Sequence, residues 1–266
     1  MTRQVACLIL LLSFLAVGAL AGTDIIPSAE GNKWTYDCYK YMRGTMSLKD
    51  KVVSAFEDTS FGSSVYEIVS IDSKANPPTF DYRETTTTVS SSGGQSSESQ
   101  VDIKFANTDK EQRIVSTNRA ASADDDEPDQ QEYSPALLYY LRDAAPGKQW
   151  TVGDMKQEDT VTPMSAKAVG KETVTVPAGT FKDCLKVVYY SDTVTGEVDI
   201  WGKPFTMASG KTRGIYWIAD GVGVVKELEI AVSTAQAPGP DGKTMLSIES
   251  ASCDVRELKP GYVVNK

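Results

Sequence analysis

The sequence predicts an all-β protein that is built mainly from antiparallel strands. Segments rich in β-branched and aromatic residues recur at intervals of about ten residues, with Gly and Pro turns between them. Segments with helical periodicity are nearly absent. About a dozen strands fit most simply into one large curved sheet or a partly open β-barrel. We also expect one short helix and two halves of similar layout.

The most regular pattern lies between Thr173 and Ile230 and consists of two strand–turn–strand units. A Pro177-Ala178-Gly179 turn separates the strands of the first unit, and Asp220-Gly221 separates those of the second. The run from Val187 to Tyr190 is apolar on both faces, which is typical of a strand in the middle of a sheet. We interpret this stretch as scaffold rather than as a chemical site.

The N-terminus has the pattern of a secretory signal peptide. Arg3 supplies a positive charge, residues 5–17 are apolar except for Ser13, and Ala19-Leu20-Ala21 matches a small-x-small cleavage site. The apolar run is shorter than the roughly 20 residues that a membrane-spanning helix needs. We therefore predict a signal peptide at residues 1–21, cleavage near Ala21, and a secreted or periplasmic protein without an integral membrane segment.

Composition narrows the function classes. The 266 residues include 27 Lys and Arg against 36 Asp and Glu, a formal net charge of −9. Nucleic-acid binding requires a cluster of Lys and Arg residues. The sequence shows no such cluster, so no nucleic-acid partner is expected. The chain contains no histidine, which excludes Ser-His-Asp and Cys-His catalysis and histidine-ligated zinc. We expect a protein that is not an enzyme and has no cofactor or metal.

Cysteine usage leaves the disulfide pattern open. After signal removal the chain has Cys38, Cys184 and Cys253, and export permits disulfides. An odd number allows at most one internal bridge, and the sequence does not choose among the three possible pairs.

The N-terminal half, residues 22–119, reads as a series of strands. The first strand begins at Trp34, and Trp34, Tyr36 and Cys38 alternate onto one face. Gly44 and Gly62 are interpreted as breaks between strands. Further strands are expected at residues 46–56, 65–71, 79–89, 101–105 and 113–117, with a flexible hairpin tip at residues 90–99.

An acidic segment follows at residues 120–133. Asp124-Asp125-Asp126-Glu127 is a run of carboxylates before Pro128. A calcium loop is one interpretation, but the run lacks the Gly and Glu positions of an EF-hand, so a solvated linker is preferred. Whether residues 124–127 bind a cation stays open.

Residues 134–266 are expected to hold the short helix and the second half of the same domain. Ser134 at the N-cap and Pro135 at the first helical position are typical of the start of a helix. An apolar face would follow at Leu137, Leu138, Tyr140 and Leu141, and Pro146-Gly147 would end the helix.

The chain then resembles its own beginning. Gly147 precedes Trp150 by three residues, as Gly31 precedes Trp34. Strands are expected at residues 167–176, 184–190, 197–201, 214–218, 222–232 and 244–257, with a loop at 202–213 and a loose tail from Gly261.

Three stretches carry a resemblance to known proteins. The first stretch, near the predicted mature start, is Gly31-Asn32-Lys33-Trp34-Thr35-Tyr36. The other two are Val176-Pro177-Ala178-Gly179-Thr180-Phe181-Lys182-Asp183-Cys184-Leu185-Lys186-Val187 and Tyr216-Trp217-Ile218-Ala219-Asp220-Gly221-Val222-Gly223-Val224-Val225-Lys226. This signature, mainly within residues 140–232, resembles exported bacterial proteins of undefined function. At the level of fold these are similar to the LolA and LolB lipoprotein carriers. The resemblance implies a half-barrel that cradles acyl chains.

Candidate functional residues are aromatic. Trp34, Tyr36, Trp201, Tyr216 and Trp217 lie on predicted strands and are the tentative wall of a ligand site; Trp150 belongs to the same class, and core packing is the alternative for all of them.

Three other groups are interpreted as structural. Glu197 and Asp199 share a strand face about 7 Å apart and could serve a glycosidase, but exposed charges are the preferred interpretation. Gly221 and Gly223 fit a turn better than a phosphate loop, because a strand rather than a helix follows. The cations in the loop at 202–213 are read as solvated: Lys203, Lys211 and Arg213.

These observations favour an exported, non-enzymatic β protein. It would bind an apolar or amphipathic small molecule, or a protein partner, in the concave face of its sheet. A structural or adhesive domain of the cell envelope with a filled core is the alternative, and a histidine-free carboxylate hydrolase is the second alternative.

Overall fold

The computed structural model describes residues 25–49, 51–94, 96–120, 129–157, 160–192, 194–200, 203–239, 241 and 243–265; the side chains of 129, 157 and 199 are not described. The predicted signal peptide, the acidic run at 124–127 and Trp201 lie outside these residues.

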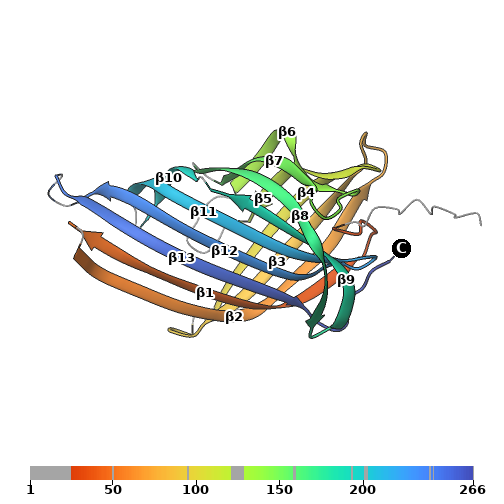
Figure 1. Cartoon of the computed structure of the whole chain (residues 1–266), viewed down its shortest axis with the longest axis horizontal. Helices are drawn as coiled ribbons and strands as arrows, with labels where there is room; N and C mark the ends of the chain where they lie inside the picture. The colour runs from red at the N-terminus through yellow and green to blue at the C-terminus, as the bar shows by residue number, and fades with distance from the viewer. Residues whose placement is uncertain are drawn as a thin grey trace, which may run out of the picture.

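Thirteen strands make up the described part of the chain and form a single antiparallel sheet (Figure 1). Their bounds are β1 Lys33–Leu48, β2 Lys51–Asp72, β3 Thr79–Ser90, β4 Ser96–Asn107, β5 Glu111–Arg119, β6 Asp129–Leu141, β7 Gln149–Gln157, β8 Thr160–Val176, β9 Gly179–Ser191, β10 Thr195–Asp199, β11 Pro204–Ala219, β12 Gly223–Pro238 and β13 Met245–Leu258. The all-β prediction is confirmed.

The strand order joins the two ends of the chain in the middle of the sheet. It runs β10-β8-β9-β11-β12-β13-β1-β2-β3-β4-β5-β6, with β7 paired to β8 and β10 also paired to β11. β1 and β13 pair from Tyr36 opposite Leu258 to Leu48 opposite Leu246. Both sequence halves therefore contribute to one open, strongly curved sheet.

Two glycines that were interpreted as strand breaks lie inside strands, so those predictions were wrong. Gly44 is within β1 and Gly62 within β2. A Cβ atom on Gly62 would lie 1.8 Å from the carbonyl oxygen of Thr87 on the neighbouring strand, and one on Gly44 would lie 2.4 Å from the Phe56 ring. Glycine is present because another group approaches closely, not because the chain turns.

The helix predicted to begin at Ser134 is wrong, because residues 129–141 form β6. This strand ends the path of the sheet, and its pairing with β5 passes from Glu132 opposite Ser116 to Leu137 opposite Ile114. Pro135 lies inside that irregularity, and an edge strand tolerates a residue without an N–H group. Burial of Leu137 and Tyr140 against the core outweighs the local helix signal. Residues 129–133, predicted as linker, belong to the same strand.

Two further predictions at the C-terminal side were wrong. The expected loop at 202–213 is mostly the first part of β11, where it pairs with β12. The tail after Gly261 is attached to the sheet, because Val263 exchanges two backbone hydrogen bonds of 2.8 Å with Lys33. The turns at Pro177-Ala178 and Asp220-Gly221 and the last strand at 244–257 are confirmed.

A chain of aromatic rings fills one half of the concave side. It links successive strands through ring pairs whose centroids lie 4.8–6.0 Å apart. The contact between Tyr139 and Tyr189 joins β6, at one end of the curved sheet, to β9, the third strand from the other end, and the Tyr189 hydroxyl donates to the Tyr139 carbonyl at 2.7 Å. The rings are Tyr36, Tyr66, Tyr82, Phe105, Tyr139, Tyr189 and Tyr216.

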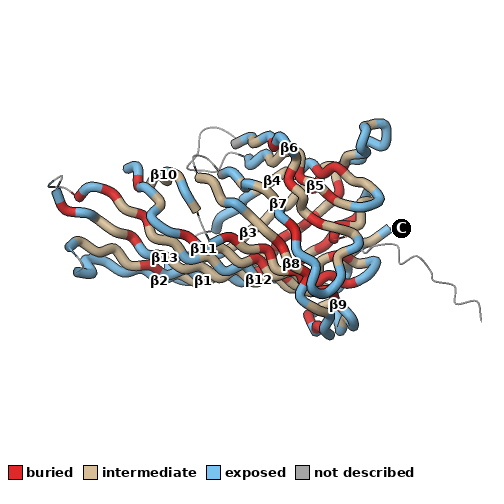
Figure 2. The backbone as a smooth tube through the Cα atoms, turned by 45° about the horizontal axis from the view of Figure 1, so that its top comes forward, coloured by how far each residue is buried: buried red, intermediate tan, exposed pale blue. Residues whose placement is uncertain are grey.

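The other half of the sheet projects beyond this core. The far ends of β1, β2, β11, β12 and β13 extend as a single curved layer, on the left in Figures 1 and 2. Buried residues concentrate in the opposite half (Figure 2). A small second apolar cluster lies in the projecting half, around Phe205 and Ile248.

Helices able to cross a membrane, meaning long and strongly apolar ones, do not occur in the described ranges.

Replacement of Gly62 by Ala is expected to lower the free energy of unfolding by about 3 kcal/mol, because the new Cβ overlaps a neighbouring strand's backbone. Gly170→Ala is the matched control, since no atom lies within 4 Å of its Cβ position. It should change stability by less than about 1 kcal/mol. Urea unfolding measures both, and equal effects would contradict the close-approach explanation.

Candidate functional site

The concave face of the sheet can be followed by strand alternation. Tyr36 faces the aromatic core, and every second residue along β1 from Tyr36 to Gly44 shares its side of the sheet. On β13 the corresponding positions include Arg256 and Ser250. This face carries a charged cluster, a hollow and an apolar cluster in succession.

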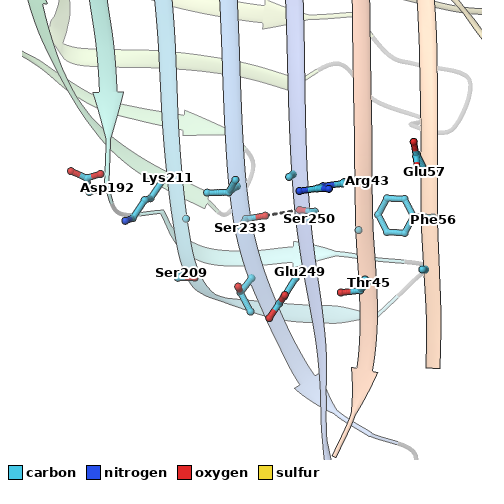
Figure 3. A pocket seen from close by; sticks show the side chains of 16 residues that line it. Arg43, Thr45, Phe56, Glu57, Asp192, Ser209, Lys211, Ser233, Glu249 and Ser250 are labelled. Atoms are coloured by element: carbon cyan, nitrogen blue, oxygen red, sulfur yellow. Dashed lines mark hydrogen bonds between the residues drawn. The ribbon is translucent and has the colours of Figure 1, made fainter. Parts of the chain in front are cut away.

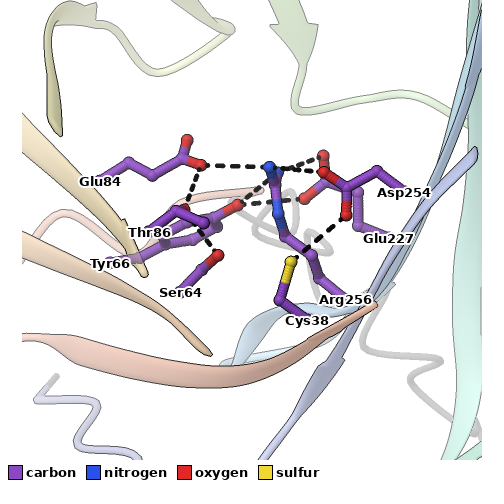
Figure 4. Close-up of polar contacts among 8 residues, drawn as sticks. All are labelled: Cys38, Ser64, Tyr66, Glu84, Thr86, Glu227, Asp254 and Arg256. Carbon is purple, nitrogen blue, oxygen red and sulfur yellow. Dashed lines mark hydrogen bonds and ion pairs between the residues drawn. The ribbon is translucent and has the colours of Figure 1, made fainter. Parts of the chain in front are cut away.

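The charged cluster is centred on Arg256 and lies next to the aromatic core (Figure 4). One Arg256 guanidinium nitrogen lies 3.1 Å from Glu227, and the other lies 3.3 Å from Glu84 and 3.1 Å from Asp254. Arg256 also donates to the Tyr66 hydroxyl at 2.8 Å. The Tyr66 hydroxyl donates to Glu227 at 3.3 Å, so the ring chain and the cluster are joined.

Charge within the cluster is unbalanced. Burial would lower the pKa of Arg256, but its neighbours, Tyr66 and the three carboxylates, raise the pKa overall, so the guanidinium stays charged. Burial raises the pKa of Glu84, against the opposing effect of Arg256. One guanidinium faces three carboxylates. Protonation of one carboxylate therefore relieves the repulsion among the three.

The thiol of Cys38 belongs to the same cluster. Its sulfur lies 3.5 Å from Asp254, and burial together with that carboxylate raises the pKa of the thiol. A protonated, buried thiol is a poor nucleophile. Cys38, Cys184 and Cys253 are all free. Cys38 and Cys253 are on neighbouring strands but on opposite faces, since Cys253 pairs with Tyr41.

Further along the strands, the concave face contains a hollow of about 660 Å³ (Figure 3). Its floor consists of Gly44, Gly210, Ser233 and Ser250, which are cross-strand partners on β1, β11, β12 and β13. The two serine hydroxyls lie 2.8 Å apart. Phe56 of β2 lies beside Gly44 and forms one wall.

Small floor residues create this hollow. A Cβ atom on Gly210 would lie 2.6 Å from Cβ of Val194, just as one on Gly44 would meet Phe56. The two glycines thus allow larger side chains to lie over the sheet while the middle stays open. Arg43, Glu57, Lys211 and Glu249 also border the hollow, but they alternate with its floor and wall residues, so their side chains lie on the opposite face of the sheet.

The apolar cluster lies beyond the hollow on the same face. Phe205, Ala235, Ala237 and Ile248 are buried there, with Met46, Met207 and Leu246 packed against them. On β13, Arg256 follows the floor residue Ser250 by six residues and Ile248 precedes it by two, which is about 20 Å and about 7 Å at strand spacing. The charged cluster, the hollow and the apolar cluster therefore follow one another along the same face of the sheet.

The tentative ligand-wall residues lie elsewhere. Trp34 and Tyr36 are buried in the core, where they donate to the carbonyls of Val222 at 2.8 Å and Val224 at 2.7 Å. Tyr216 packs against Tyr189 in the ring chain. None of these lines the hollow.

Trp217 alternates to the opposite, convex face. Its ring lies between Lys186 and Lys226, at 4.9 and 5.9 Å, and its indole N–H donates to Glu172. Trp150 is buried against Tyr140 and Tyr189 in the core.

The remaining sequence candidates lie on strands or in a turn. Glu197 is on β10, while the side chain of Asp199 is outside the described residues. Gly221 and Gly223 form the β11–β12 turn with positive φ values of 68° and 96°, as expected for a turn. Lys211 and Arg213 lie on β11 rather than in a loop. No His, Cys, Asp or Glu group suited to a metal ion occurs among the described residues.

Sequence reasoning missed the Arg256 cluster and the hollow. The signal in the sequence was the alternation of strand faces. Glu227 lies two residues from the buried Val225, and Arg256 lies two residues from the buried Leu258, so both charged residues are on faces that point to the core. Four strands distant in sequence supply the cluster, and alternation alone does not show that they are neighbours.

Comparison with known proteins gives one family match. Residues 140–229 match a DUF3108-like family model. The matched region runs from the end of β6 into β12 and overlaps the two-hairpin signature. No curated protein matches the chain. The resemblance to the LolA and LolB carriers stays a prediction.

A solved crystal structure of a candidate lipoprotein from Parabacteroides distasonis is also similar. The two share 16% sequence identity, and the alignment covers 90% of this chain and 99% of that one, with a TM-score of 0.36. A similarity of this size does not establish a shared fold.

Replacement of Arg256 by Gln should lower the free energy of unfolding by about 3–5 kcal/mol at neutral pH, because it leaves buried carboxylates without their cation. Arg83→Gln is the control, since its pair with Asp102 is partly exposed, with side-chain exposures of 42% and 31%. That change should cost less than about 1 kcal/mol. Similar losses for the two variants in denaturant titrations would mean that Arg256 does not compensate the charge of the buried carboxylates.

Replacement of Glu84 by Gln should change the pH dependence of stability. The pKa of Glu84 in the folded protein is raised above its ordinary 4.5, so the wild type loses stability as pH rises from about that value through the folded pKa. The Gln variant lacks this loss. Its stability relative to wild type should therefore increase with pH across that window, and thermal unfolding at a series of pH values tests this. A constant difference would contradict the raised pKa.

Proposed function

We propose that this chain is an exported, non-enzymatic protein that binds an amphipathic small molecule in the hollow of its concave face. The observation that carries the proposal is the succession on that face of the Arg256 cluster, the hollow and the apolar cluster around Ile248. A ligand with one polar and one apolar end matches this order, because each end then meets a surface of its own kind.

The size of the hollow supports a small ligand. Small-molecule sites are commonly about 300–1,000 Å³, and this one is about 660 Å³. Its floor offers the two serine hydroxyls of Ser233 and Ser250 as hydrogen-bond groups, and the ring of Phe56 as an apolar wall. The combination of a few polar groups with an apolar wall is the usual composition of such sites.

A binding role agrees with the chemistry of the residues. The chain has no histidine, and burial raises the pKa values of Tyr36, Tyr66, Cys38 and Glu84, so these groups favour their protonated forms. Carboxylates near the core converge on Arg256 rather than on one another across the hollow. Export is part of the proposal and rests on the signal-peptide pattern of residues 1–21.

A filled interaction domain is the second candidate, and the aromatic core favours it for one half of the molecule. That half is packed by the ring chain, so a ligand would be confined to the projecting half. The two candidates differ in whether the floor residues control ligand binding.

Titration with the fluorescent probe N-phenyl-1-naphthylamine tests the proposal. Probe binding to the exported protein should be saturable, and the double variant Ser233→Leu/Ser250→Leu, which fills the floor, should weaken it by about tenfold or more, since the added groups occupy the apolar probe's volume. Mass spectrometry of protein under native conditions should also detect retained ligand in the wild type and less in the variant.

Thr87→Leu is the control, because it places a leucine on the opposite face of the sheet. It should leave probe affinity unchanged. Non-saturable binding, or equal affinity of the filled variant and the control, would reject the hollow as a ligand site.

A further inference from the structure

The first part of β2 is an uncovered strand edge. Residues 51–58 pair with β1 on one side, whereas β3 joins the other side only from Ser60, which lies opposite Ser90. No described strand covers this edge between Lys51 and Asp58. It forms the outer border of the projecting half of the sheet, at the lower left of Figure 1.

This segment is also unusually exposed on both faces. All residues from Lys51 to Glu57 are exposed, and they include Val52 at 62%, Val53 at 55% and Phe56 at 38%. A long, apolar strand edge with unpaired backbone groups is a template for another strand. Backbone hydrogen bonds would supply affinity and the side chains specificity.

The sequence of the edge is complementary to itself. Lys51 is at one end, Glu57 and Asp58 are at the other, and Val52, Val53 and Phe56 lie between. In an antiparallel pair of two such edges related by a twofold axis, one central residue faces its own copy. With Ala55 at that centre, and with Val53 as the extra residue that β2 carries opposite Met46 and Ser47, Lys51 of each copy lies opposite Asp58 of the other and beside its Glu57. The two valines of each copy then lie near the partner's Phe56. Opposite charges and paired apolar side chains both stabilise adjacent strands.

We propose that two copies of this chain pair through residues 51–58 of β2 and join their sheets into one continuous antiparallel sheet. A twofold axis through the centre of the pair makes the contact closed, so the assembly stops at a dimer. Because Phe56 also lines the hollow, the partner strand extends the wall of the hollow in each copy.

The lysine has two effects in this arrangement. A lysine on a strand edge discourages indiscriminate pairing. Here the acidic end of an identical edge neutralises it, which selects a second copy over an unrelated strand.

Sedimentation equilibrium of the exported protein tests the proposal directly. The wild type should show a concentration-dependent monomer–dimer equilibrium. Val53→Asp should raise the dissociation constant by about a hundredfold, since it places a charge in the centre of the contact. Val169→Asp is the matched control, because Val169 is a similarly exposed valine, at 48%, on β8; it should leave the equilibrium unchanged.

A charge swap separates pairing from folding. Lys51→Glu and Glu57→Lys should each weaken the dimer by about tenfold, because each sets like charges together twice in the symmetric contact. The double variant Lys51→Glu/Glu57→Lys should recover affinity to within about threefold of the wild type. This rescue would not occur if the single changes merely damaged the fold.

A protein that stays monomeric over the whole concentration range would overturn the proposal, and so would a dimer that Val53→Asp leaves intact. Appearance of a different polypeptide bound to β2 in place of a second copy would overturn it as well. The outcome is independent of the probe titration, because the dimer can form whether or not the hollow binds a ligand.

Discussion

The contact between Tyr139 and Tyr189 is the interaction on which the shape of this molecule depends. It joins β6, the last strand at one end of the curved sheet, to β9 near the other end, and so holds the two sides of the curve together. Aromatic pairs of this kind contribute about 0.5–1.5 kcal/mol each beyond the area they bury. Because the rings continue from Tyr139 through Phe105 to Tyr36, the curvature is supported along its length rather than at a single point.

Arg256 marks the boundary between the filled and the open half of the concave side. On one side of it lie rings that exclude water, and on the other lie glycines and serines that leave space. A buried ion cluster contributes little net stability compared with apolar packing of the same volume. Its main physical consequence is to place fixed charge on one side of the hollow along the same face, while the apolar cluster around Ile248 lies on the other side.

Strand patterns could be predicted well from the sequence where local and tertiary preferences agree. The hairpins at Pro177-Ala178 and Asp220-Gly221 follow from turn chemistry, and period-two alternation identified β13. Predictions failed where tertiary contacts override the local signal. Gly44 and Gly62 have the residue type of a turn but are required by close approach, and Ser134-Pro135 has the form of a helix start in an edge strand.

The sequence by itself determined the strand class, the alternation of faces and the absence of histidine chemistry, because these depend on residue type and short-range spacing. The tertiary structure alone decided which faces are concave and which strands are neighbours. Arg256 therefore meets Glu84 across more than half of the chain, and Gly44 and Gly210 become the floor of one hollow. Such meetings follow from the strand order of the sheet, which no local pattern encodes.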